Sequence, residues 1–194
     1  MKENNDVVSI VFGDSIVYGL HDKESGGWVN RVRMFLENNL NNNFVINLGI
    51  PGQNSSDILE RFENEIKVRY NDSDDFNIIF SLGIKDSLLL SKDEKHIVKF
   101  EKNILEIINK TKKYTKNIYF LGLIKTDNKK RREYKQKNII QIDKSLEKIC
   151  KKNNVEYIKL RNIIDKEYLQ DGLHPNNLGH KKISEIILQK IFKQ

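Results

Sequence analysis

Two short segments near opposite ends of the 194-residue chain carry side chains that together can catalyse acyl transfer. The apolar run at residues 8–12 ends at Gly13-Asp14-Ser15, and Asp171-Gly172-Leu173-His174 lies near the C-terminus. A serine just past a buried parallel strand sits where α/β sheets place their ligands, and it becomes a nucleophile where a base reaches it. His174 is the candidate base, and Asp171 is close enough within one loop turn to orient its ring.

Each segment also has a purely structural interpretation. Gly-Asp-Ser is common in turns, where Asp14 or Ser15 caps a helical turn. Asn176 or Asn177, just after the second segment, can cap the last helix. The remaining histidines have no comparable acid and turn beside them: His21, His96 and His180. Ser15, Asp171 and His174 are therefore the candidate catalytic residues.

Five short apolar runs alternate with helical patterns along the chain. Strands are expected at about residues 7–12, 44–48, 78–82, 118–123 and 155–160. Helices are expected at about 28–38, after a cap at Ser55 or Ser56, at 94–110, and around apolar stripes at 139–149 and 183–191. This alternation predicts a flavodoxin-like three-layer α/β/α fold with a parallel sheet of order 2-1-3-4-5. The length indicates a single domain over residues 1–194.

Three features meet at one edge of the predicted sheet. Ser15 follows the first strand, Gly52 follows the second, and the segment 83–86 follows the third. The carboxyl ends of neighbouring parallel strands lie together, so a crevice is expected there. Pro51-Gly52 also suits a type II turn, which needs a positive φ at its second central residue.

Composition excludes several kinds of protein. The formal charge of +7 permits attraction to anions, but none of the familiar nucleic-acid motifs is present, so no nucleic acid is expected as a partner. The single cysteine, Cys150, excludes an internal disulfide and falls on a helical apolar stripe, as a buried thiol would. Residues 1–6 are polar, without a signal-peptide core, and no apolar run approaches the roughly 20 residues that cross a bilayer. A cytoplasmic protein without a membrane span is expected, and its oligomeric state is left open.

Four segments, in order, resemble the blocks of the SGNH, or GDSL, hydrolase family. They are Gly13-Asp14-Ser15-Ile16-Val17-Tyr18-Gly19, Asn47-Leu48-Gly49-Ile50-Pro51-Gly52, Ser81-Leu82-Gly83-Ile84-Lys85-Asp86 and Asp171-Gly172-Leu173-His174-Pro175-Asn176. The resemblance covers nearly the whole chain and implies a flavodoxin-like fold with serine esterase or thioesterase chemistry, using no metal and no cofactor. It assigns Ser15 as nucleophile, His174 as general base and acid, and Asp171 as the group that orients His174. The amides of Ser15 and Gly52 would bind the oxyanion.

The third segment departs from the family pattern at one position. The family places an Asn side chain in the oxyanion hole, and this chain has Lys85 there. An ammonium can donate hydrogen bonds and favours a developing negative charge, but a long side chain is poorly preorganised and can instead pair with Asp86. We hypothesise that activity survives with Lys85 as the donor.

The favoured function is hydrolysis of a small acyl ester, either an acetylated carbohydrate or a short-chain ester. The alternatives are an acyltransferase on the same fold and a non-catalytic protein that binds a sugar or acyl group because Lys85 disables the site. The basic segment 125–132, which follows the fourth strand, either attracts an anionic substrate or is a solvated loop. Tyr18, Trp28 and Tyr134 either line a binding groove or pack in the core.

Overall fold

Five parallel strands form the centre of the molecule. A computed structural model describes residues 6–40 and 42–194, so the polar N-terminal residues 1–5 considered above lie outside the described part. The strands are β1 (Val7–Gly13), β2 (Asn43–Gly49), β3 (Asp75–Ser81), β4 (Asn117–Leu121) and β5 (Glu156–Ile158), in the order β2-β1-β3-β4-β5. The predicted fold and strand order are confirmed. That residues 1–194 form one domain stays a prediction.

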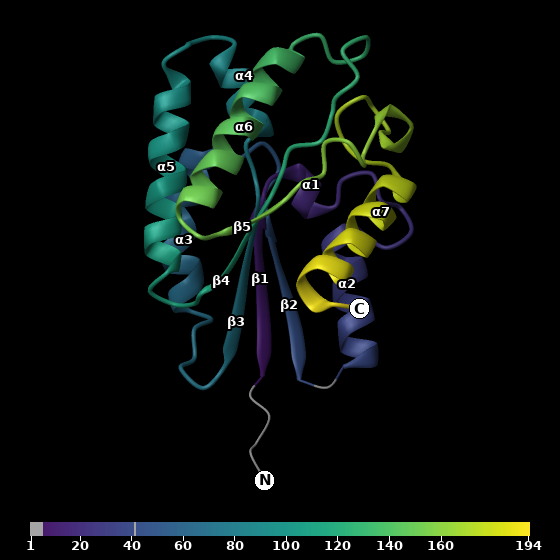
Figure 1. Cartoon of the computed structure of the whole chain (residues 1–194). Coiled ribbons are helices and arrows are strands. Elements are labelled where there is room, and N and C mark those ends of the chain that lie inside the picture. Colours follow the sequence, from purple (N-terminus) through teal and green to yellow (C-terminus); the bar gives the residue numbers. More distant parts are fainter. Residues whose placement is uncertain (1–5, 41) are drawn as a thin grey trace.

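Helices cover both faces of this sheet (Figure 1). One face carries α3 (Ser55–Lys67), α4 (Ile84–Leu90), α5 (His96–Thr111) and α6 (Gln136–Lys152), and the other carries α2 (Trp28–Asn39) and α7 (Asn177–Ile187). Alternate residues of a strand point to opposite faces. In β1, Ile10 and Phe12 pack beneath the first group of helices, while Val11 packs beneath α2 and α7.

The parallel register aligns the ends of the three strands that carry the candidate site. Gly13 pairs with Gly49 of β2 and with Ser81 of β3. The short helix α1 (Ser15–Tyr18) follows at once, and the loops after β4 and β5 approach the same edge of the sheet (Figure 1). The chain after β5 contains a single 3₁₀ turn, η1 (Lys166–Tyr168), before α7, and it ends in η2 (Leu188–Phe192). No helix in the described residues is long and apolar enough to cross a membrane.

Several local predictions were wrong. Helix α3 is capped by Asn54, not by Ser55 or Ser56, because the Asn54 side chain accepts the Ser56 amide while the Asp57 carboxylate accepts the Asn54 amide. The segment 84–90, for which no helix was predicted, is helix α4, which begins after Gly83 at a φ of +115°. Cys150 is fully buried as expected, and burial raises the pKa of its thiol to about 12.

Candidate active site

The nucleophile candidate is held at the first turn after β1 by close packing. Ser15 is the first residue of α1, and the buried Asp14 caps this helix by accepting the Ile16 amide at 2.9 Å. A Cβ at Gly49 would lie 2.2 Å from the Tyr18 nitrogen, so only glycine lets β2 approach α1 this closely. This contact and the cap fix the direction in which Ser15 points.

Asn47 ties the same short helix to β2 with its side-chain amide. Its Nδ2 donates to the Val17 carbonyl at 2.9 Å, and its Oδ1 accepts the Gly49 amide at 2.9 Å. The Ser15 turn is therefore held from the neighbouring strand as well as from its own.

The loop before α7 brings the predicted base and acid to Ser15. His174 Nε2 lies 2.9 Å from Ser15 Oγ, and His174 Nδ1 lies 2.9 Å from Asp171 Oδ2. Asn176 caps α7 by accepting the Gly179 amide, so its predicted capping role is confirmed. The two ends of the chain thus meet in one hydrogen-bonded series of the kind that activates a serine.

The Asp171 carboxylate is held by four donors. Its Oδ1 accepts the amides of Leu173 at 3.0 Å and His174 at 2.8 Å, while its Oδ2 is shared by the His174 ring and the Arg131 guanidinium. Burial alone raises the pKa of this carboxyl, but the His174 and Leu173 bonds together with Arg131 lower that pKa well below its usual range. These donors therefore favour the ionised form of Asp171.

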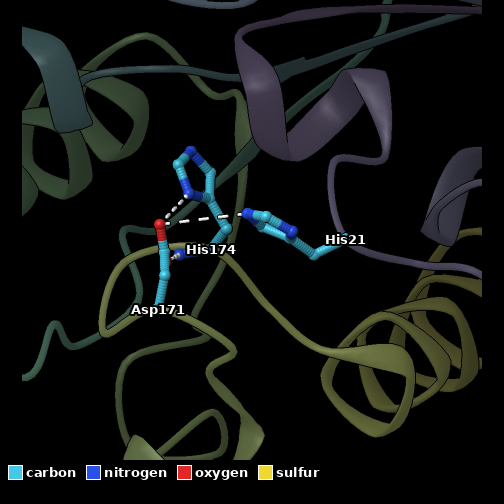
Figure 2. Close-up of side chains that lie close together, drawn as sticks. All are labelled: His21, Asp171 and His174. Carbon is cyan, nitrogen blue, oxygen red and sulfur yellow. Dashed lines mark hydrogen bonds and ion pairs between the residues drawn. The ribbon is translucent and has the colours of Figure 1, made fainter.

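Two residues at Asp171 were missed by sequence reasoning. Arg131 belongs to the basic segment 125–132, but it reaches the carboxylate instead of standing free in solvent. His21, whose neighbour in the sequence is Asp22, places Nε2 3.9 Å from Asp171 Oδ2 instead, and its ring meets that of His174 edge-on (Figure 2). Both contacts arise from loops far apart in the chain, so no local pattern announces them.

His21, Asp171 and His174 are also the group of side chains that could hold a metal ion in the part of the chain that the structure describes. The other two histidines lie elsewhere. His180 is buried, where Nδ1 accepts the Trp28 amide and Nε2 donates to the Leu20 carbonyl. His96 is bonded to Asp86.

The predicted oxyanion donors line a cavity beside Ser15. The cavity has a volume of about 290 Å³ and its wall includes Ser15, Gly52, Lys85, Arg131 and His174. Gly52 has a φ of +83° in a turn closed by a bond from the Gln53 amide to the Ile50 carbonyl, so the turn that was predicted at Pro51-Gly52 does form.

Lys85 does not pair with Asp86. The Asp86 carboxylate is fully buried and accepts bonds from the Ser55 amide and hydroxyl, at 3.0 and 2.7 Å, and from His96 Nε2 at 3.0 Å. Among the described residues no acceptor binds the Lys85 ammonium. A cation is thus left at the cavity wall.

The aromatic candidates separate into three environments. Tyr134 lines the cavity, Trp28 is buried in the core between the sheet and α2, and Tyr18 is exposed. Of the basic segment, Lys125 lies 3.4 Å from Asp165, and Lys129, Lys130 and Arg132 are exposed. Arg131 is the residue of this segment that lines the cavity, and which of the two interpretations applies to the segment stays a prediction.

Comparison with known proteins agrees with this fold and with the four segments. The profile of the GDSL-like lipase/acylhydrolase family matches residues 11–182. The structure of a lipase/acylhydrolase from Enterococcus faecalis is similar with a TM-score of 0.80 and 24% identity, covering 95% of this chain and 94% of that one. An acetylxylan esterase from Geobacillus stearothermophilus gives a TM-score of 0.76 and 18% identity over 98% and 96% of the two chains. The search of curated proteins gave no significant match.

Proposed function

Because the chain belongs to the GDSL-like lipase/acylhydrolase family, we propose that this hydrolase is a serine esterase that cleaves a small acyl ester through an acyl-enzyme on Ser15. The observation that carries the proposal is the series Ser15 Oγ–His174 Nε2–Asp171, in which both contacts of the His174 ring measure 2.9 Å. A purely binding site has no need of this trio, so its intact geometry argues against a disabled enzyme.

The proposed reaction begins with attack of Ser15 Oγ on the ester carbonyl carbon. The serine proton passes to His174 Nε2, while Asp171 holds the proton on Nδ1 and stabilises the imidazolium that forms. Collapse of the tetrahedral intermediate breaks the bond to the alcohol, which leaves with the proton from Nε2. Water then attacks the acyl-enzyme by the same route, so that the acid is released and Ser15 is restored.

Negative charge on the carbonyl oxygen needs donors that are already in place. We assign this role to the amides of Ser15 and Gly52, with the Lys85 ammonium as a third donor at the family's Asn position. Neither of these two amides bonds to another protein group among the described residues. Lys85 adds a full positive charge where the oxyanion develops.

The size and lining of the cavity support a small acyl group. Its volume of about 290 Å³ is at the lower end of the range for ligand pockets. Leu20, Pro51, Ile84 and Leu173 give it an apolar wall on which a methyl or short alkyl chain can rest. An acetylated carbohydrate or a short-chain ester is therefore the substrate class that we propose, and the acetylxylan esterase named above is consistent with it.

The proposal is tested by labelling with a fluorophosphonate probe and by turnover of p-nitrophenyl acetate. Ser15→Ala should lose both, while Ser73→Ala, which removes an exposed serine from a turn, should keep both. Circular dichroism checks that each variant is folded. Adding alcohol acceptors and identifying the products separates hydrolysis from acyl transfer, since both start from the same acyl-enzyme. A folded wild-type protein that neither labels nor turns over would contradict the proposal.

A further inference from the structure

His21 brings a third potential metal ligand to Asp171 and His174, which are called the catalytic pair below. Its Nε2 lies 3.9 Å from Asp171 Oδ2, and the His21 and His174 ring centroids are 5.4 Å apart. The potential ligand atoms of the three residues all lie within 4.8 Å of one another, and Figure 2 shows the His21 and His174 rings both approaching the same oxygen of the carboxylate. Two imidazoles and one carboxylate are a common set of zinc ligands.

The backbone holds His21 in this position before any ligand arrives. Its φ of +73° lies in the left-handed region, which a residue other than glycine keeps only where its surroundings enforce it. On one side, the Leu20 carbonyl accepts a bond from His180 Nε2 at 3.0 Å. On the other, the buried Asp22 carboxylate accepts Arg31 Nε at 2.7 Å and the Gly27 amide at 3.0 Å. The side chain of His21 is about one third exposed, so an ion can reach it from solvent.

We propose that His21 Nε2, Asp171 Oδ2 and His174 Nδ1 form an inhibitory Zn²⁺ site. The inference rests on the proposed function, because the metal acts by occupying the catalytic pair. A tetrahedral zinc ion holds its nitrogen and oxygen ligands about 3.3 Å apart. The Nδ1–Oδ2 distance of 2.9 Å and the Nε2–Oδ2 distance of 3.9 Å lie on either side of that value, and all three ligand atoms lie within 4.8 Å of one another, so the ion has to draw the two imidazoles together.

Zinc inhibits here by fixing the wrong tautomer of His174. The ion binds the lone pair of Nδ1 and displaces the proton that lies between Nδ1 and Asp171; the ring gives this proton to solvent and takes one up on Nε2, so that no proton is released overall. The neutral, metal-bound ring then carries its one proton on Nε2. That nitrogen faces Ser15 Oγ at 2.9 Å and is no longer able to accept the serine proton. The serine therefore stays protonated and unreactive.

Arg131 limits how tightly the ion binds. Its guanidinium already contacts Asp171 Oδ2, and its positive charge opposes a second cation on the same oxygen. Zinc accordingly binds reversibly and is removed by a chelator. Arg131→Gln should make the site more sensitive to zinc, a direction that a surface site elsewhere on the chain would not show.

The experiment measures hydrolysis of p-nitrophenyl acetate by the full chain over a range of ZnCl₂ concentrations, each variant being normalised to its own metal-free rate. His21→Asn is the test variant, since Asn accepts a positive φ but cannot reach the ion. His96→Gln is the matched control, because it removes a histidine that binds Asp86 instead. We expect zinc to inhibit the wild type, EDTA to restore it, and His21→Asn to raise the half-inhibiting concentration at least about tenfold. The control should respond as the wild type does, and Mg²⁺, which prefers oxygen ligands, should not inhibit.

Calorimetry separates this inference from the proposed function. Ser15→Ala keeps all three ligands, so it should bind one zinc ion per chain, and adding His21→Asn should abolish that binding. If the wild type lacks esterase activity but shows this pattern of binding, the function fails and the site stands. If the wild type is active and zinc neither binds nor inhibits, or inhibits His21→Asn as strongly, the site is overturned and the function stands.

Discussion

Lys85 offers the sharpest test of how this site stabilises charge. Lys85→Met keeps the length of the side chain and removes its ammonium, whereas Lys85→Asn introduces the side chain that the family has at this position. Removing one well-placed oxyanion donor costs about 10²–10³ in kcat. Lys85 lines the cavity beside Ser15 and Gly52, whose two amides remain after the change. Since a half-buried lysine is less preorganised than a backbone amide, we expect the fall in kcat for Lys85→Met to lie below that range, at about 10- to 100-fold.

The assay is steady-state hydrolysis of p-nitrophenyl acetate, with kcat and KM determined separately. A donor that acts in the transition state lowers kcat and kcat/KM together, whereas a cation that binds an anionic part of the substrate raises KM. With this neutral ester we expect the loss in kcat, and Lys85→Asn should match or exceed the wild type. Unchanged kcat in Lys85→Met would show that the ammonium lies outside the oxyanion hole. If neither the wild type nor Lys85→Asn hydrolyses the ester, the hypothesis that activity survives with a lysine donor is refuted.

Three further predictions concern the groups around the nucleophile. Arg131→Gln should lower kcat about three- to tenfold, because a partly exposed ion pair is lost while two amides still hold Asp171; an unchanged kcat would contradict this. Burial raises the pKa of Asp14 from 3.8 to about 7, so the folded state binds the carboxyl proton more tightly than the unfolded chain does. The stability that this protonated carboxyl contributes is therefore lost as the pH rises from about 4 to 7. In urea titrations Asp14→Asn should therefore gain stability over the wild type between these pH values, by on the order of 4 kcal/mol, and a constant difference would count against the shift. Gly49→Ala should lower the free energy of unfolding by roughly 2 kcal/mol or more, since its Cβ would meet the Tyr18 nitrogen; a thermal melt like that of the wild type would show that the backbone yields easily.

Local patterns in the sequence were enough to predict the sheet and the place where the site forms. Apolar runs such as Ile78–Phe80 define strands by themselves, and the strand order follows from general rules of chain connection. Helix α4 escaped prediction because its seven residues are too few to show an amphipathic period, and its start depends on the left-handed Gly83. Whether so short a helix forms depends on the tertiary contacts that its residues make.

The surroundings of the three candidate catalytic residues were harder to predict than the residues themselves. Ser15, Asp171 and His174 are close to strand ends or helix caps, whose positions follow from the sequence. Arg131 and His21 reach Asp171 through loops, and His21 does so with a backbone conformation that non-glycine residues seldom adopt. These contacts depend on tertiary bonds such as that between His180 and the Leu20 carbonyl, which no spacing in the sequence encodes.

The chemistry available to Lys85 is set by the residue beside it. Had the Asp86 carboxylate been free, the Lys85 ammonium would have had a partner one residue away. Instead the Asp86 carboxylate is buried, and its oxygens accept hydrogen bonds from Ser55 and His96. Asn103 in turn donates to the Ser55 hydroxyl at 3.0 Å. Removing these buried partners would leave an unsatisfied carboxylate, so the network is costly to open. The positive charge of Lys85 therefore stays available at the cavity wall because the neighbouring carboxylate of Asp86 is bonded inside the core.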